Sequence, residues 1–143
     1  MKRGFTLVEL LGVIVVLAFV ALITVPIVLS VINKSDDSAT RRSAENYRKA
    51  VKESIAKENL SGNKFYPSRC DVITEGDNKG YLNCVLKDGT QNALLVVKME
   101  GTVPNSGTIF FEDSEPVDTT LYYKDCYVNI NNKGVSTLTK TNQ

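Results

Sequence analysis

The sequence predicts an α+β protein in which a long N-terminal α-helix, membrane-spanning in its first half, packs by its second half on a small antiparallel β-sheet. Three observations predict this fold class. A long uncharged apolar stretch lies near the N-terminus, a segment with apolar residues at helical spacing comes next, and from Phe65 onward apolar and polar residues alternate.

The N-terminal part divides into residues 1–4, which carry Lys2 and Arg3, and residues 5–32, which are almost entirely apolar. From Leu10 to Ile32 the chain has 23 uncharged residues. As a helix they would reach ~34 Å, which exceeds the ~30 Å hydrocarbon core of a bilayer. Basic residues stay on the cytoplasmic side, so we expect a single-pass protein with its N-terminus inside. The run is too long for an ordinary secretory signal peptide and lacks a small-x-small cleavage site at its end.

Glu9 is the one charged residue within residues 5–32. A charge near the middle of an apolar helix costs ~2.5–3.5 kcal/mol on insertion scales. This carboxylate therefore needs a partner or a function.

The segment Gly4-Phe5-Thr6-Leu7-Val8-Glu9-Leu10-Leu11 resembles the processing site of type IV pilins and the related pseudopilins. The resemblance implies a pilin-like fold, a leader of residues 1–4, cleavage between Gly4 and Phe5 by a prepilin peptidase, and methylation of the new Phe5 amine by the same enzyme. It implies a filament-assembly role for Glu9, which would help to recruit each incoming subunit. It also implies such a role for Pro26, where the family commonly bends its helix.

The partners implied by the resemblance are the peptidase and methyltransferase, other pilin subunits, membrane lipid before assembly, and an assembly machine with a cytoplasmic ATPase. No cofactor is implied. The precursor would lie in the cytoplasmic membrane, and the product in a cell-surface filament or a pseudopilus.

Cleavage before Phe5 would leave an ammonium four residues from Glu9, on the same face of the helix. The residues leave open whether Glu9 meets the amine of its own chain or of a neighbour, and the resemblance favours the neighbour. Pro26 either kinks the helix or is a tolerated membrane proline.

Residues 33–62 are expected to continue the helix as an amphipathic segment. An apolar stripe with three- and four-residue spacing comprises Ala44, Tyr47, Val51 and Ile55. Ser61-Gly62 supplies the stop signal.

Residues 63–143 are expected to form an antiparallel β-sheet head. Lys87-Asp88-Gly89-Thr90 and Asn131-Asn132-Lys133-Gly134 are turn signals between strands. The inward-facing sets with period two are Leu82/Cys84/Leu86, Leu95/Val97/Met99, Ile109/Phe111 and Cys126/Val128/Ile130.

Three cysteines, Cys70, Cys84 and Cys126, lie in the exported part, where disulfides persist. Residues 75–80 predict a turn midway between Cys70 and Cys84, which would bring these two opposite each other. We predict a Cys70–Cys84 disulfide, with Cys126 as a small buried hydrophobe. Pairing of Cys126 with either of the others, or three thiols, stays open.

Two acidic stretches contain the oxygen ligands that calcium prefers. One is expected to be a loop with Glu112, Asp113, Glu115 and Asp118, and the other a second loop with Asp71, Glu75 and Asp77. Neither has the spacing of a recognised calcium loop, so we predict no metal site.

The chain has no histidine, no Gly-x-Ser-x-Gly and no phosphate-binding glycine loop, so we predict no catalytic residues and no enzymatic activity. The cations at 41–42 and 48–49 alternate with Glu45, Glu53 and Glu58, which favours a solvated helix face. The net charge falls from +1 to −1 without Lys2 and Arg3. Nucleic acid is therefore not an expected partner, and any DNA contact would have to be local.

The leading hypothesis is a structural subunit of a type IV pilus-like filament. A pseudopilin of a DNA-uptake or type II secretion machine would carry the same N-terminus. A hypothesis of another class is a single-pass membrane-tethered binding domain, which would keep an uncleaved N-terminus.

Overall fold

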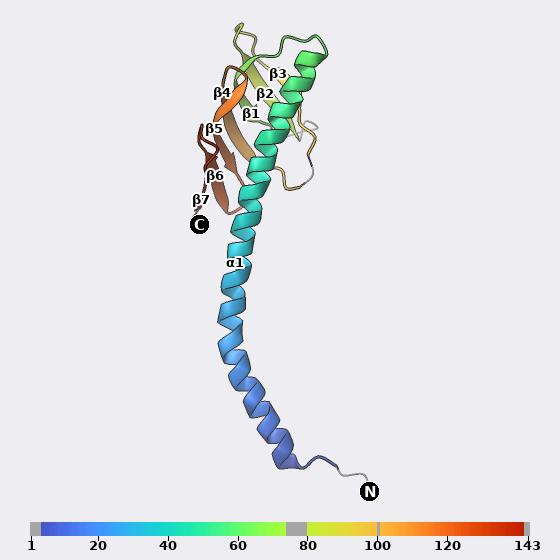
Figure 1. The fold of residues 1–143 in the computed structure, drawn as a ribbon, viewed down its shortest axis with the longest axis vertical. Helices are drawn as coiled ribbons and strands as arrows, with labels where there is room; N and C mark the ends of the chain where they lie inside the picture. Colours follow the sequence, from blue (N-terminus) through green and yellow to red (C-terminus); the bar gives the residue numbers. More distant parts are fainter. Residues whose placement is uncertain (1–3, 74–79, 100, 142–143) are drawn as a thin grey trace. The chain divides into compact units, whose positions relative to one another are not determined.

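The structure, a computed structural model, describes residues 4–73, 80–99 and 101–141. The chain forms two compact units, one up to Asp37 and one from Ser38 onward. The α1 helix (Leu7–Leu60) contributes to both, and all strands lie in the second unit (Figure 1). The predicted α+β arrangement, a long N-terminal helix with an antiparallel sheet, is confirmed.

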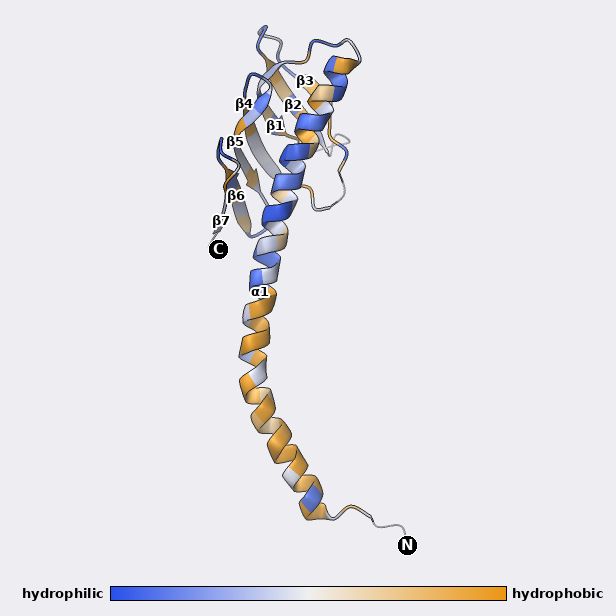
Figure 2. Cartoon of the chain, in the orientation of Figure 1, coloured by the Kyte–Doolittle hydropathy of each residue, from blue (hydrophilic) through white to orange (hydrophobic). Residues whose placement is uncertain are grey.

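In the first unit, α1 is apolar and exposed. Figure 2 shows hydrophobic residues along this part of the helix and hydrophilic ones along its second half. Within the described residues α1 is the one helix that is long and apolar enough to cross a membrane. Its apolar side chains have nothing to pack on within the unit, since Leu7 and Leu22 are 80% and 73% exposed. This is the surface expected of a segment that lies in lipid or among other helices.

In the second unit, α1 packs on the sheet through a narrow stripe. The stripe consists of Ala44, Tyr47, Val51 and Ile55, all at most 2% exposed, as the sequence predicts. The helix then ends where Gly62 adopts a φ of 90°. The amides of Gly62 and Asn63 donate to the carbonyls of Asn59 and Glu58, which is the Schellman pattern of helix termination.

In the described part of the chain, seven strands form one antiparallel sheet in the order β3-β2-β1-β4-β5-β6-β7. Their bounds are β1 Pro67–Val72, β2 Tyr81–Leu86, β3 Ala93–Val96, β4 Ser106–Glu112, β5 Glu115–Tyr122, β6 Cys126–Ile130 and β7 Ser136–Lys140. Each connection joins neighbouring strands except the one after β3, which crosses to the far side of β1. The sheet therefore ends in β3 at one edge and β7 at the other.

The sheet face that packs on α1 carries the core. The predicted inward-facing sets supply most of it, since Leu82, Leu95, Ile109, Val128 and Ile130 are at most 1% exposed. Three residues at the ends of these sets are only partly buried, namely Leu86, Met99 and Cys126. The two predicted turns connect β2 to β3 and β6 to β7.

Candidate functional site

The N-terminus of α1 is capped by three reciprocal hydrogen bonds between Thr6 and Glu9. Thr6 N–H and Thr6 Oγ1 each donate to Glu9 Oε2 at 2.9 Å, and Glu9 N–H donates to Thr6 Oγ1 at 3.3 Å. The helix begins at Leu7, so Thr6 is the N-cap and Glu9 the third helical residue. This is a capping box, which satisfies two amides that the helix start would leave without partners.

The capping box gives Glu9 a partner, Thr6, that is not among the partners expected from the sequence. Thr6 is three residues before Glu9, and Thr-x-x-Glu ahead of an apolar run is the signal by which it could have been found. In the structure the chain is continuous through Gly4 and Phe5, so the Phe5 nitrogen is a peptide amide without charge. The carboxylate therefore already has hydrogen-bond partners before any cleavage occurs.

Both donors of Thr6 use the same carboxylate oxygen, Oε2. The second oxygen, Oε1, takes no part in these two bonds. A carboxylate can accept about four hydrogen bonds, so Glu9 can cap its own helix and accept from a further donor at the same time.

A shallow groove runs along one face of α1 beside Glu9. It is lined by Phe5, Glu9, Gly12, Val13, Val16 and Leu17. Gly12 has no side chain, and a Cβ built at this position would meet no atom within 4 Å. Small residues let helix backbones approach closely in an apolar setting, so this face is suited to receive another helix.

Pro26 lies inside α1, and the helix continues through it without interruption. Proline has no N–H to donate to the carbonyl four residues back, which is that of Leu22. Nearby, Thr24 Oγ1 donates to the carbonyl of Val20 at 2.9 Å, so this hydroxyl is satisfied within the helix. The structure thus accommodates Pro26 in a continuous helix, and its role in assembly stays a prediction.

Residues 1–25 match the family model described as the prokaryotic N-terminal methylation motif. The N-terminal segment is therefore a class III signal peptide of the kind that type IV pilins and pseudopilins carry. Together with the long helix and the antiparallel sheet, it defines a pilin-like precursor of α+β fold. No curated protein and no solved structure matches the chain.

This motif implies processing by a prepilin peptidase and assembly with other pilin subunits. It fits a membrane-anchored precursor, because the motif leads into the part of α1 that is long and apolar enough to cross a membrane.

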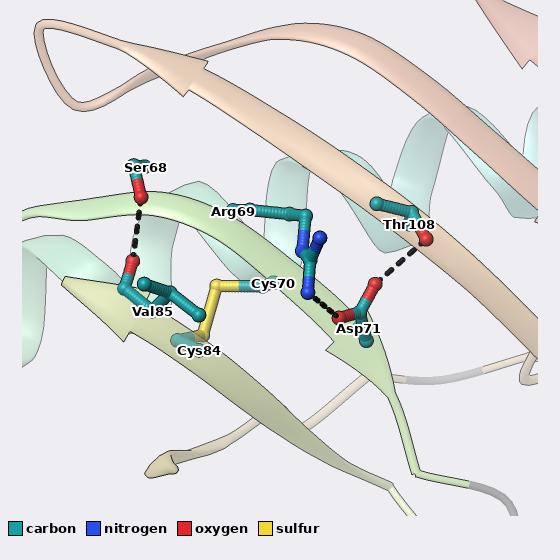
Figure 3. Close-up of a disulfide and its surroundings, with 7 residues drawn as sticks. All are labelled: Ser68, Arg69, Cys70, Asp71, Cys84, Val85 and Thr108. Atoms are coloured by element: carbon teal, nitrogen blue, oxygen red, sulfur yellow. Dashed lines mark hydrogen bonds and ion pairs between the residues drawn. A yellow bond between two sulfur atoms is a disulfide. The ribbon is translucent and has the colours of Figure 1, made fainter. Parts of the chain in front are cut away.

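In the head, Cys70 on β1 and Cys84 on β2 form a disulfide (Figure 3). They are register partners on neighbouring strands, with Cα atoms 4.0 Å apart, and both are fully buried on the face toward α1. The turn predicted at residues 75–80 lies almost wholly outside the described residues. Cys126, expected to be a buried hydrophobe, keeps its thiol and is only partly buried.

On the opposite face, next to the disulfide, the strands are joined by polar side chains. Asp71 pairs with Arg69 at 3.2 Å and accepts from Thr108 Oγ1 at 2.7 Å, which connects β1 to β4 (Figure 3). Asp71 therefore has structural partners, and the expectation that it belongs to an acidic loop is wrong, because it lies within β1. Glu75 and Asp77, the other acidic residues of that stretch, lie outside the described residues.

The expectation of one acidic loop around residue 115 is wrong. Glu112 ends β4, Glu115 begins β5, and only Asp113 and Ser114 form the turn between them. Both turn residues have positive φ, 50° and 67°, which is the requirement of the tight turn that suits a twisted hairpin. Asp118 lies within β5. The carboxylates are thus distributed along two strands, and among the described residues no three metal-binding side chains come together.

The second half of α1 is joined to the sheet by polar contacts that the sequence did not predict. An Arg48 guanidinium N–H donates to the carbonyl of Pro116, Lys52 pairs with Glu115 at 2.7 Å, and Ser136 Oγ donates to Glu45 at 2.6 Å. Partial burial lowers the pKa of Arg48, while nearby carboxylates on β5 act in the opposite direction. Arg48 therefore helps to hold the helix on the sheet, and it is not part of a solvated basic patch.

Proposed function

We propose that this protein is a structural subunit of a type IV pilus-like filament. In this proposal the leader of residues 1–4 is removed by cleavage after Gly4, and Phe5 becomes the N-methylated first residue. Residues 5–32 first anchor the precursor in the membrane and later form the filament core. Residues 33–62 connect this helix to the head of residues 63–143.

The observation that carries the proposal is the combination of the methylation motif with a capped, fully exposed apolar helix. A plain anchor would need the apolar length alone. Here a carboxylate sits at the helix start, at the edge of a groove that contains Gly12. These features are the ones needed to receive a second helix with a charged N-terminus.

The capping box suggests how one carboxylate could serve both states of the chain. In the precursor, Glu9 caps its own helix through Thr6. Cleavage would turn the Phe5 nitrogen into an ammonium, and the attraction between ammonium and carboxylate is much stronger in an apolar medium than in water. Because Oε1 lies outside the capping box, Glu9 can accept from a neighbour's amine without releasing Thr6.

The head suits the outside of a filament. Its core is shielded by the sheet and by the second half of α1, and its two β1–β2 cysteines are cross-linked, as expected of an exported domain. An assembly machine with a cytoplasmic ATPase would supply the work of extracting the apolar helix from lipid.

The test is the chemical state of the N-terminus in the native membrane and in material sheared from the cell surface. We expect a chain that begins at N-methylated Phe5, together with filaments visible by electron microscopy. A chain that keeps Met1 would indicate a membrane-tethered binding domain. A processed chain without surface filaments would indicate a pseudopilin of a secretion or DNA-uptake machine.

A substitution separates processing from assembly. Glu9→Gln keeps the shape and much of the capping geometry but removes the charge. We expect normal cleavage after Gly4 and a large loss of filaments. Filaments at the wild-type level would show that the charge of Glu9 has no part in assembly.

A further inference from the structure

Among the described residues, the β3 edge of the sheet is apolar and exposed. β3 has the sequence Ala93-Leu94-Leu95-Val96, with no charge and no proline. Its outer side chains, Leu94 and Val96, are 53% and 45% exposed. Edge strands of soluble proteins are normally blocked by charges, prolines or bulges, so an apolar, exposed edge indicates a surface that another strand covers.

The backbone of β3 offers hydrogen-bonding groups along this edge. Val97 N–H donates to the carbonyl of Gly80, at the start of β2. In an antiparallel ladder the groups that point to one neighbour alternate along the strand. The N–H and C=O groups of Leu94 and Val96 therefore point away from β2, toward the open side.

A groove runs along the same edge, between β3 and the second half of α1. It is lined by Ala50 and Ser54 of α1 and by Val96 at the end of β3, and its rim carries two acidic and two basic side chains, those of Glu53, Glu58, Lys57 and Lys98. The groove lies at the sheet edge beside α1, where the next strand of a longer sheet would be placed.

The other edge of the sheet, β7, runs in the same direction as β3. All six pairings are antiparallel, and seven strands in alternation leave the first and last parallel to each other. Thr141 N–H donates to the carbonyl of Asp125 beside β6. The alternation then directs the backbone groups of Leu138 away from β6, toward the open side.

We propose that β7 of one copy pairs in parallel with β3 of the next copy, so that the sheets of neighbouring subunits become continuous. This inference rests on the proposed function, because it requires copies side by side in a filament. The partner is a second copy of this chain, and the contact is head-to-tail. Such contacts between two different surfaces generate open helical assemblies when the rotation between copies does not close a ring.

The side chains of the two edges match in this arrangement. In parallel pairing Leu138 lies opposite Leu95, and its backbone bonds to Leu94 and Val96. Leu138 faces the inner side, where it is half-buried against the core, so it would enter the groove beside Ala50 and Ser54. Thr137 and Thr139 face outward, next to Leu94 and Val96. β-Branched threonines on an aliphatic pair are favourable strand neighbours.

Pairing of β3 with β3 of a second copy is the main alternative. That contact would be a two-fold antiparallel one, about an axis perpendicular to the sheet, and it would reverse the direction of α1 in one copy. Subunits that leave the same membrane have their helices in the same direction. Translation from β7 to β3 keeps all helices on one side of the sheet and in one direction, so the head-to-tail contact is the one compatible with a common membrane origin.

Cysteine cross-linking of the full-length chain in its native cells tests the pairing. In a Cys126→Ala background, Leu94→Cys combined with Thr137→Cys should give, after mild oxidation, a ladder of disulfide-linked species beyond the dimer. Each single variant should give none, and Phe110→Cys with Thr137→Cys is the matched control, because Phe110 is on the same face but in mid-sheet. A dimer from Leu94→Cys alone would show β3–β3 contact and overturn the proposal.

A charge at the edge provides the second measurement. Leu94→Lys should reduce the sheared filament, whereas Phe110→Lys, a change at a residue of similar exposure (47%), should leave it unchanged. N-terminal sequencing accompanies both variants. The edge pairing would be overturned, with the pilin function intact, by one combined result. In that result the processed chain forms abundant filaments, the double-cysteine variant gives no disulfide-linked ladder, and Leu94→Lys does not reduce the filaments. A wild-type chain that keeps Met1 and forms no filament would overturn both.

Discussion

Loss of the buried disulfide should lower the stability of the head by a predictable amount. Cys70 and Cys84 are separated by 14 positions in the chain. For a loop of this size the loss of chain entropy in the unfolded state corresponds to about 3 kcal/mol. With an unfolding entropy of roughly 2.1 cal/mol/K per residue, the unit from Ser38 to Gln143 should lose about 13 °C in Tm.

The variant is Cys70→Ala/Cys84→Ala, in the full chain solubilised in detergent. Two alanines remove both sulfurs and leave no buried thiol to reform a bond. Unfolding is followed by near-ultraviolet circular dichroism of the tyrosines, since the chain has six tyrosines and no tryptophan. The protein is compared with Cys126→Ala, which removes a half-buried sulfur without a cross-link.

We expect the double variant to melt roughly 10–15 °C below the wild type, and Cys126→Ala to melt close to it. The reasoning would be refuted if the double variant melted at the wild-type temperature. It would also fail if Cys126→Ala showed the larger fall, because the cross-link would then involve a different pair.

Three further changes test other parts of the structure. Thr6→Val should destabilise the N-terminus of α1 by about 1 kcal/mol and lower the filament yield while cleavage after Gly4 stays normal. Thr6→Ser should keep the helix stability and the filament yield of the wild type. Equal filament yields from the two variants would show that the capping box has no part in assembly. Burial raises the pKa of Tyr47, whose hydroxyl has no hydrogen-bond partner among the described residues. The unfolded chain therefore loses this proton first, and stability should fall as pH rises above about 10. In denaturant titrations from pH 8 to 11, Tyr47→Phe should reduce this loss of stability. At neutral pH the variant should be as stable as the wild type or up to about 1 kcal/mol more stable. The same loss of stability between pH 8 and 11 in both proteins would show that Tyr47 is not its source. Gly107→Ala would place a Cβ 2.5 Å from the carbonyl oxygen of Thr120, at a cost of about 1–3 kcal/mol, measured as a fall in the denaturation midpoint that Ser106→Ala should not show.

The N-terminal helix could be predicted from the sequence because its signals are local. Its apolar length, the Gly4-Phe5 junction and the carboxylate at Glu9 all lie in one continuous stretch of the chain, residues 4–32. The apolar stripe from Ala44 to Ile55 also depends on helical spacing alone, and burial in the structure matches it residue by residue.

The partners of individual side chains were harder to predict, because they depend on residues distant in the chain. Arg48 contacts Pro116, and Lys52 contacts Glu115, across 68 and 63 positions. No periodicity encodes such contacts. The acidic stretch around Glu115 was interpreted as a loop because charged residues are frequent in turns, whereas its tight turn at Asp113 and Ser114 depends on positive backbone angles that non-glycine residues rarely adopt.

The sequence by itself determined that the chain carries the methylation motif and an apolar helix long enough to span a membrane, because hydropathy and the motif act over short distances. Only the tertiary structure decided how the strands are ordered, with the crossing after β3 that leaves β3 and β7 as the two parallel edges. Strand order depends on which apolar faces can be buried together under α1, and that is a property of the whole unit. The open β3 edge, where we place the next subunit, follows from that order.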